Sequence, residues 1–164
     1  QAAPKIEAVS VNNRQTTELK RGEKQFDAVL MKHLKQQYEE LYELTPTPEL
    51  LDIFSIRYTY HNLKVLLKEK FAKKDFSHLL VPIGRYSLAT LKQLVETRDS
   101  QDVPSVMVKA VREAYEDFEN FERLETADVF MDTYYFRHLR MSERELQDDK
   151  VTEFVNFKIS LQEV

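Results

Sequence analysis

Residues 50–71 read LLDIFSIRYTYHNLKVLLKEKF and decide the fold of this chain. Apolar residues stand on several sides of the segment and return at helical spacing at Leu63, Leu66 and Leu67. The centre, residues 54–60, alternates like a β-strand, but the whole run is longer than an ordinary strand. The sequence therefore predicts a buried helix over 50–71 and leaves a strand over 54–60 as the less favoured alternative. The lysine-rich last turn suits the negative end of the helix dipole.

A second helical pattern precedes this segment. Its apolar residues recur at the i, i+3, i+4 and i+7 spacing of one helical face: Phe26, Val29, Leu30, Leu34, Tyr38, Leu41 and Tyr42. The sequence TPTP over 45–48 ends this helix, because each proline disfavours the α conformation of the residue before it. Thr47 is placed to cap the next helix, with Pro48 at its first position. We expect an antiparallel helix pair. Residues 1–22 are polar and read as a tail or an irregular entry, although 14–21 could extend the helix.

The rest of the chain predicts shorter helices. Residues 75–85 read as a turn or loop, Ser87 is placed to cap a helix that ends before 99–101, and Asp102 is placed to cap the following one. Further helices are expected over 127–139 and from about Asp148 or Asp149 onward. All-β folds need glycines at their turns, whereas this chain has two glycines and 32% charged residues. The predicted class is all-α.

Composition also excludes several chemistries. The length of 164 residues fits one domain of ordinary size. The two glycines, Gly22 and Gly84, lie far apart, which excludes the glycine-rich loops that bind nucleotide phosphates. The absence of cysteine excludes disulfides, thiolate nucleophiles and cysteine zinc sites, and favours a reducing, cytosolic setting. No apolar run reaches the ~18 residues that span a bilayer, and no signal core is visible, so a soluble chain is expected.

The charges are balanced overall and separated locally. A net charge of −4 predicts no nucleic-acid partner. Residues 57–74 are mostly basic and residues 113–128 mostly acidic, which fits either solvated helix faces or a complementary docking surface. The four histidines form no metal-ligand pair on a helix, and Asp75 with His78 in a loop is a weak candidate. The sequence therefore predicts no catalytic residue, no metal and no cofactor.

An internal repeat is suggested by sliding the chain against itself by 101 positions. About 38 positions then align without a gap, with Asp27 on Asp128, Ile56 on Phe157 and Tyr60 on Leu161. Coincident helical periods could produce part of this agreement. The repeat predicts a polar segment over 1–22, a first unit over 23–100 and a second, truncated unit over 101–164. The chain would then be a fragment of a longer repeat protein.

The run from Leu51 to Lys64, followed by LLKEKF over 66–71, resembles a recurring helix of the C subunit of V-type and archaeal-type ATP synthases, whose eukaryotic counterpart is the d subunit. Residues 82–84, PIG, before a leucine-rich helix, and Glu125-x-x-Asp128 before Phe154, are similar to the rest of that family's unit. The resemblance covers about residues 23–164. The family often has Asp where this chain has Thr59 and Ser160, and Glu163 replaces Asn62 in the second copy.

The resemblance implies a function without catalysis. Family members are funnel-shaped proteins with a three-fold repeat of helix pairs, on the cytoplasmic face of the membrane. They join the proteolipid c-ring to the central-stalk subunits of the soluble head and pass rotation between them during ATP-coupled proton or sodium transport. No small-molecule substrate is implied. A generic helical scaffold that binds other proteins is the alternative, and an enzyme with a carboxylate site ranks third.

The family motif singles out seven residues: Asp27, Arg57, Thr59, Tyr60, Asn62, Lys64 and Asp128. As structural residues, Thr59 could bond a carbonyl, Asn62 could bridge to a neighbouring helix, and Lys64 could pair with an acid such as Asp27. As functional residues they would line the socket that receives the stalk. Because they lie among apolar residues, the structural role is favoured.

Overall fold

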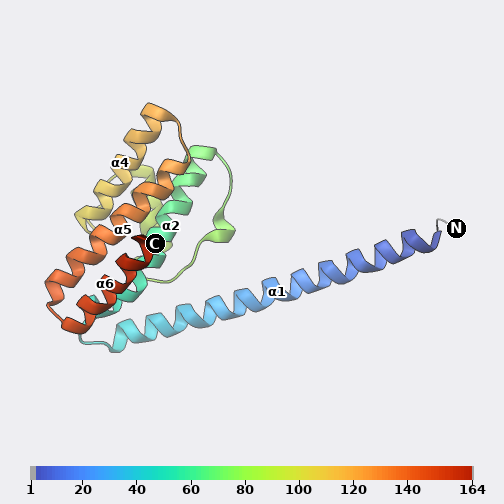
Figure 1. Ribbon diagram of the computed structural model, residues 1–164, viewed down its shortest axis with the longest axis horizontal. Helices are drawn as coiled ribbons and strands as arrows, with labels where there is room; N and C mark the ends of the chain where they lie inside the picture. The colour runs from blue at the N-terminus through green and yellow to red at the C-terminus, as the bar shows by residue number, and fades with distance from the viewer. Residues whose placement is uncertain (1–2, 164) are drawn as a thin grey trace. The chain divides into compact units, whose positions relative to one another are not determined.

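The computed structural model describes the backbone of residues 3–163 and the side chains of residues 14–162. In this part of the chain the elements are helical: α1 (Ala3–Leu44), α2 (Pro48–Ala72), η1 (Ser77–Leu79), α3 (Leu88–Thr97), α4 (Ser105–Phe121), α5 (Glu125–Leu146) and α6 (Asp149–Glu163) (Figure 1). The all-α prediction is confirmed, and the strand alternative for 54–60 is wrong. The chain divides into two compact units, Gln1–Gln37 and Tyr38–Val164.

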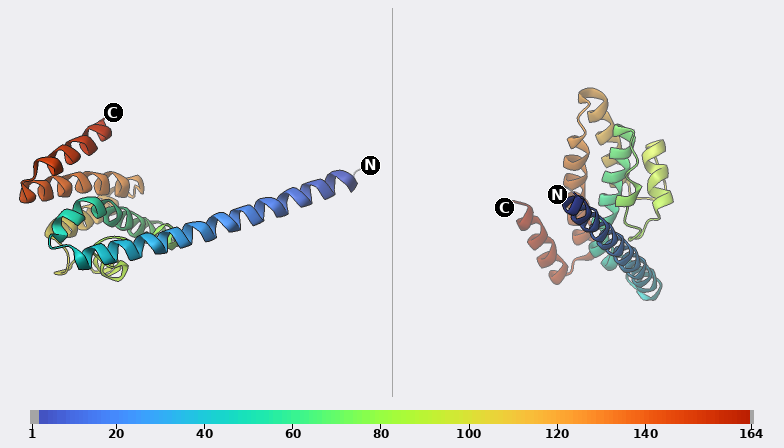
Figure 2. Two further views of the ribbon diagram at one scale, coloured as in Figure 1. Left: turned by 90° about the horizontal axis from the view of Figure 1, so that it is seen from below. Right: turned by 90° about the vertical axis from the view of Figure 1, so that its right-hand side faces the viewer.

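Helix α2 forms the centre of the second unit. It packs against α5, α3, α4 and the 3-10 turn η1, which explains why its apolar residues are spread around the helix rather than along one face. Its buried apolar residues are Ile53, Ile56, Tyr60, Leu63, Val65, Leu66, Leu67 and Phe71. Helices α4 and α5 pack on each other, α6 packs on α5, and α3 and α6 lie at opposite edges of the bundle (Figure 2). The prediction of a buried helix over 50–71 is confirmed.

The first unit consists of the N-terminal part of α1. The expectation of an irregular entry over 1–22 is wrong for the described residues, because the helix already begins at Ala3. Gly22 lies within it and costs about 1 kcal/mol relative to alanine. This is too little to end a helix whose neighbouring residues, such as Leu19 and Lys20, favour the helical conformation. The apolar side chains of Leu19, Phe26 and Val29 are exposed.

The end of α1 packs against α2 inside the second unit. The ring of Tyr38 makes an edge contact with Tyr58, and Tyr42 contacts Ser55 and Asp52. Because Tyr42 meets the start of α2 and Tyr38 a later turn, residues 38–44 run antiparallel to α2, as predicted for the helix pair. Thr47 occupies the N-cap position before Pro48, although its side chain makes no capping hydrogen bond.

Two further helix starts follow the local sequence, and a third does not. The Ser87 hydroxyl accepts a hydrogen bond from the Thr90 N–H at 3.1 Å, which confirms the predicted cap of α3. Helix α6 begins at Asp149, as expected. The predicted cap at Asp102 is wrong, because α4 begins at Ser105 with Pro104 in the cap position. Pro104 restricts the preceding residue to extended conformations, so no helix can start before it.

The helix boundaries agree with the offset of 101. Helix α2 begins at Pro48 and α6 at Asp149, 101 positions later, and a short turn precedes each. The two compact units do not coincide with the predicted repeat units, because α2 and α5, which the repeat assigns to different units, share one core. The boundaries 23–100 and 101–164 stay a prediction. Glu163 lies outside the described side chains.

Candidate functional site

Polar side chains of α2 hold the connection between η1 and α3. Asn62 is buried, and its side-chain amide donates to the Val81 carbonyl at 2.6 Å while its carbonyl accepts from the Val81 N–H at 2.8 Å. The expectation that Asn62 bridges to a helix is wrong, because an irregular segment covers this side of α2. Asn62 bonds both backbone polar groups of Val81; the carbonyl also accepts from the Ile83 N–H at 2.8 Å, so the Val81 N–H is the group for which an apolar side chain could not substitute.

The same connection approaches α2 closely at Gly84. Gly84 has a φ of +126°, which L side chains rarely adopt. A Cβ at this position would lie 3.0 Å from the Thr59 hydroxyl oxygen. Nearby, the His61 ring Nε2 lies 2.8 Å from the Leu79 carbonyl oxygen. Thr59, Asn62 and Gly84 therefore fit together, and the motif residues here position a loop on a helix.

Tyr60 joins α2 to α5. Its hydroxyl lies 2.9 Å from Nδ1 of His138, and the two rings meet edge to face. Burial raises the pKa of Tyr60 and lowers the pKa of His138 to about 4. Both groups are therefore neutral at pH 7, and the neutral imidazole can accept the Tyr60 proton at Nδ1. The sequence reasoning missed His138, although it follows Met131 and Tyr134 on one apolar helical face.

The neutral His138 makes the stability of the protein depend on pH. The pKa rises from about 4 in the folded chain to 6.5 in the unfolded chain, so between these values the unfolded state binds more protons. The free energy of unfolding should therefore fall as the pH decreases through this window, by about 2 kcal/mol between pH 7.5 and pH 5. His138→Asn, which keeps an acceptor for Tyr60, should remove this contribution. Urea denaturation over a pH series measures it.

The control for this prediction is His33→Asn, because His33 is exposed on α1. That variant should keep the pH dependence of the unmodified chain. Other buried or paired acids contribute to acid unfolding in both proteins, so the quantity to compare is the difference between variant and parent at each pH. An identical pH dependence for His138→Asn and the parent would contradict the assignment.

A cluster of ion pairs also joins α2 to α5, along the line of contact that we call the α2–α5 seam. The Lys64 ammonium lies 2.8 Å from Asp132 and 4.0 Å from Asp128, and Lys68 lies 2.7 Å from Asp128. Lys64 was expected to pair with an acid such as Asp27, and the acids that it contacts are Asp132 and Asp128. Asp128 is the residue that the 101-position offset aligns with Asp27. These pairs are partly exposed and contribute about 1 kcal/mol or less each.

The six motif residues that lie in the second unit thus do not form one site. Tyr60, Lys64 and Asp128 meet along the α2–α5 seam, whereas Thr59 and Asn62 face the loop on another side of α2. Arg57 is exposed, with its guanidinium 4.7 Å from the Tyr58 ring. Asp27 is exposed on α1.

A second polar network, which the sequence reasoning missed, surrounds Asp52. Tyr42 donates a hydrogen bond to one Asp52 oxygen at 2.7 Å, and Arg85 contacts the other at 2.6 Å. The Tyr42 hydroxyl also lies 2.6 Å from the Ser55 hydroxyl. Burial, together with the Asp52 carboxylate, raises the pKa of Tyr42, and the hydrogen bond to Asp52 raises the pKa of Arg85. Asp52 therefore ties α1, α2 and the loop before α3 together.

Next to this network lies a cavity of about 130 Å³. Its polar lining includes Asp52, Ser55, Arg85 and His138. Asp52 is already bonded to Tyr42 and Arg85, and His138 to Tyr60, so these groups satisfy one another rather than converge on an empty point. Among the described residues, no three His, Cys, Asp or Glu side chains lie close enough together to hold a metal ion. The polar side chains of this region therefore hold neighbouring segments of the chain together.

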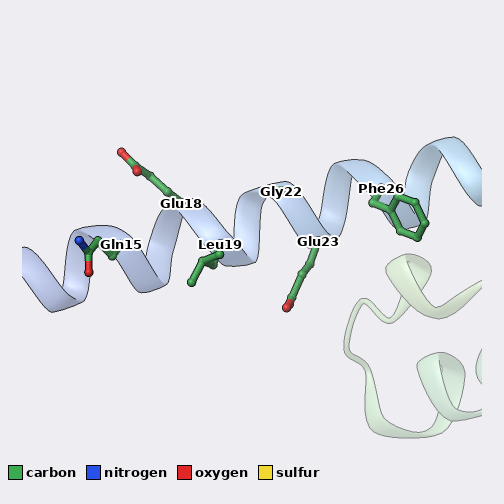
Figure 3. A pocket seen from close by; sticks show the side chains of 6 residues that line it. All are labelled: Gln15, Glu18, Leu19, Gly22, Glu23 and Phe26. Carbon is green, nitrogen blue, oxygen red and sulfur yellow. The ribbon is translucent and has the colours of Figure 1, made fainter.

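A shallow hollow of about 700 Å³ lies on α1 itself (Figure 3). Its lining residues all come from one helix: Gln15, Glu18, Leu19, Gly22, Glu23 and Phe26. Figure 3 shows Glu18 and Glu23 pointing in different directions, so the polar groups do not converge.

Within residues 3–163, none of the helices combines the length and apolar character needed to cross a bilayer.

The packed helix pairs and the polar ties between them define an all-α helical protein. Comparison with known sequences gives the family. The sequence model of the ATP synthase (C/AC39) subunit family matches residues 12–164, and the chain belongs to this family. The family predicted from residues 51–71 is thereby confirmed.

One curated relative is the C subunit of the V-type sodium ATPase of Enterococcus hirae. The two sequences are 31% identical over 118 residues, which cover 72% of this chain and 36% of the relative. The chain therefore spans about a third of the length of that protein. No solved structure matches the chain.

Proposed function

We propose that this chain forms part of a non-catalytic rotor subunit of a V-type ATPase or ATP synthase. The subunit links the central stalk of the soluble head to the proteolipid c-ring on the cytoplasmic side of the membrane. Family membership over residues 12–164 is the observation that carries this proposal. The relative is named for a sodium ATPase, and the transported ion here is sodium or a proton.

The packing of α2 supports a mechanical role. A subunit that transmits torque must keep its helices in register under load. Helix α2 is tied to α5 through Tyr60 and Lys64, to the η1–α3 connection through Asn62, and to Arg85 through Asp52. These ties join segments that lie far apart in sequence, so a force applied to one helix reaches its neighbours through several contacts at once.

The test uses the complete gene product with an affinity tag. It should copurify with stalk and c-ring subunits. In vesicles that carry the ATPase complex, removal of the subunit should abolish ion transport while the soluble head continues to hydrolyse ATP, and adding the subunit back should restore transport. Copurification with unrelated proteins and no ATPase subunit would favour the alternative, a generic helical scaffold. Loss of ATP hydrolysis by the isolated head would contradict the non-catalytic role.

A further inference from the structure

The cavity beside Asp52 lies between the first half of α2, the loop before α3 and the end of α5. Its volume is about 130 Å³, and its lining includes Thr59 of α2, Arg85 of the loop, and His138 and Ser142 of α5. One water molecule takes up about 30 Å³ in the liquid, so the cavity has room for several molecules of this size. All of its lining residues belong to the second unit.

The contact between Tyr60 and His138 determines which ring nitrogen of His138 carries the proton. Tyr60 is 2% exposed, and within residues 14–162 the partner of its hydroxyl is Nδ1 of His138, at 2.9 Å. If Nδ1 carried a proton, the buried Tyr60 O–H would have no acceptor. Nδ1 is therefore the acceptor. Because burial lowers the pKa of His138 and keeps the ring neutral at pH 7, the single ring proton lies on Nε2. The Nε2–H group is a donor that needs an acceptor of its own.

Thr59 brings a second polar group to the same cavity. It is 2% exposed and belongs to the lining. The Thr97 hydroxyl donates to the Gln93 carbonyl, four residues earlier in its helix, at 2.8 Å. The Thr59 hydroxyl makes no such bond and has no hydrogen-bond partner among the side chains that the structure describes. Buried hydroxyls are almost always hydrogen-bonded, so the partner of Thr59 must come from the cavity.

The charges around the cavity select the kind of molecule that fits it. Arg85 and Asp52 form an ion pair at 2.6 Å, and the carboxylates of Glu49 and Glu145 also belong to the lining. The excess of carboxylates disfavours an anion, whereas the guanidinium and the Nε2–H of His138 disfavour a cation. A small neutral molecule that both donates and accepts hydrogen bonds suits all of these groups, and water is such a molecule.

We propose that this cavity is a hydration site, in which bound water accepts the hydrogen bond of His138 Nε2–H and bonds the Thr59 hydroxyl. The water extends the Tyr60–His138 contact into a chain of hydrogen bonds that leaves α2 at Tyr60, crosses the α5 side chain and returns to α2 at Thr59. Ser142 stands four residues after His138 and lines the same cavity, so its hydroxyl reaches the same water. The proposal uses contacts inside the second unit and is independent of the proposed function.

Nuclear magnetic resonance of the ¹⁵N-labelled chain at pH 7 tests both parts of the proposal. Protonated and unprotonated ring nitrogens of histidine have different ¹⁵N chemical shifts, and His138 should show a protonated Nε2 and an unprotonated Nδ1. Cross-peaks with water should appear at Hδ2 and Hε1 of His138, which flank Nε2, and at the methyl group of Thr59. A protonated Nδ1, or the absence of water contacts at His138, would overturn the proposal.

Thr59→Val and Thr133→Val form a matched pair, because each replaces a hydroxyl by a methyl group and Thr133 is exposed on α5 outside the cavity lining. Thr59→Val should weaken the water cross-peaks of His138 and lower the melting temperature by about 2–4 °C, whereas Thr133→Val should change neither. Thr59→Ser, which keeps the hydroxyl, should keep the cross-peaks. Thr59→Ala replaces Thr59→Val if that variant does not fold. Equal effects of Thr59→Val and Thr133→Val would count against the site.

Ser142→Ala distinguishes bound water from a direct contact between protein groups. If water is the acceptor, the variant should keep the water cross-peaks of His138, because alanine leaves the water in place. If the Ser142 hydroxyl itself accepted from Nε2–H, water contacts at His138 would appear only in the variant. A high-resolution crystal structure should show ordered water within hydrogen-bond distance of both His138 Nε2 and the Thr59 hydroxyl. Nε2 bonded to Ser142 or to a carboxylate in its place would overturn the proposal.

Discussion

Leu63→Ala is expected to lower the free energy of unfolding by about 2–5 kcal/mol. Leu63 is fully buried at the centre of α2, which packs against α3, α4, α5 and η1. Truncation removes one methine and two methyl carbons from a site enclosed on every side, so the surrounding helices can close the cavity only in part. Because a domain of this size is stable by about 5–15 kcal/mol, the variant should lose a large fraction of its stability. Urea denaturation followed by circular dichroism measures the change.

Leu79→Ala is the matched control for this substitution. Leu79 is 47% exposed in η1, so the same truncation removes little buried surface and should change stability by about 0.5 kcal/mol or less. Similar losses for Leu63→Ala and Leu79→Ala would contradict the placement of α2 at the centre of the core.

Asn62→Ala is expected to lower the free energy of unfolding by about 2 kcal/mol. The substitution removes both hydrogen bonds to Val81 and leaves the Val81 N–H without its partner, at about 1–3 kcal/mol, whereas the Val81 carbonyl keeps its hydrogen bond from the Ile83 N–H at 2.8 Å. The η1–α3 connection should loosen first, because Asn62 is its tie to α2. Faster hydrogen exchange at Val81 N–H, measured together with the melting temperature, would report this local effect.

Asn156→Ala provides the comparison for Asn62→Ala. Asn156 is exposed on α6 and accepts one hydrogen bond from Arg140 at 2.9 Å, so its loss should cost about 1 kcal/mol or less. If Asn62 acts through the fold, the affinity of the folded Asn62→Ala protein for stalk subunits should stay nearly unchanged. A selective loss of stalk binding with unaltered melting would instead assign Asn62 to a partner socket.

Local sequence signals were sufficient for the helices and the family. The prolines at 46 and 48, the Ser87 cap and the apolar run over 50–71 act through the residue itself or its near neighbours, and the structure has the corresponding boundaries. The two helix boundaries that were predicted wrongly also have local causes. Pro104 prevents the helix start expected at Asp102, and a single glycine is too weak to end α1 at residue 22.

The sequence predicted which residues belong to the candidate site, but it did not predict which residues they contact. The motif identified Asn62, Tyr60 and Lys64, but Val81 lies 19 residues from Asn62, His138 lies 78 from Tyr60 and Asp132 lies 68 from Lys64. Helical periodicity says which side of a helix is buried, and it does not say which segment covers that side. Asp52 was present in the quoted motif, yet its role became visible only when Tyr42 and Arg85 were placed beside it.

The sequence by itself determined that this chain is all-α, where its principal helices lie and to which family it belongs, because these properties follow from residue spacing, turn residues and motif. The tertiary structure decided which polar groups pair and which of two equivalent apolar faces is covered. Ile56 and Phe157 stand at positions that the offset of 101 aligns, but Ile56 is buried, since α5 lies along α2, whereas Phe157 is exposed. Whether a side chain is buried depends on the segments that pack against its helix, and the residue pattern of that helix alone does not predict it.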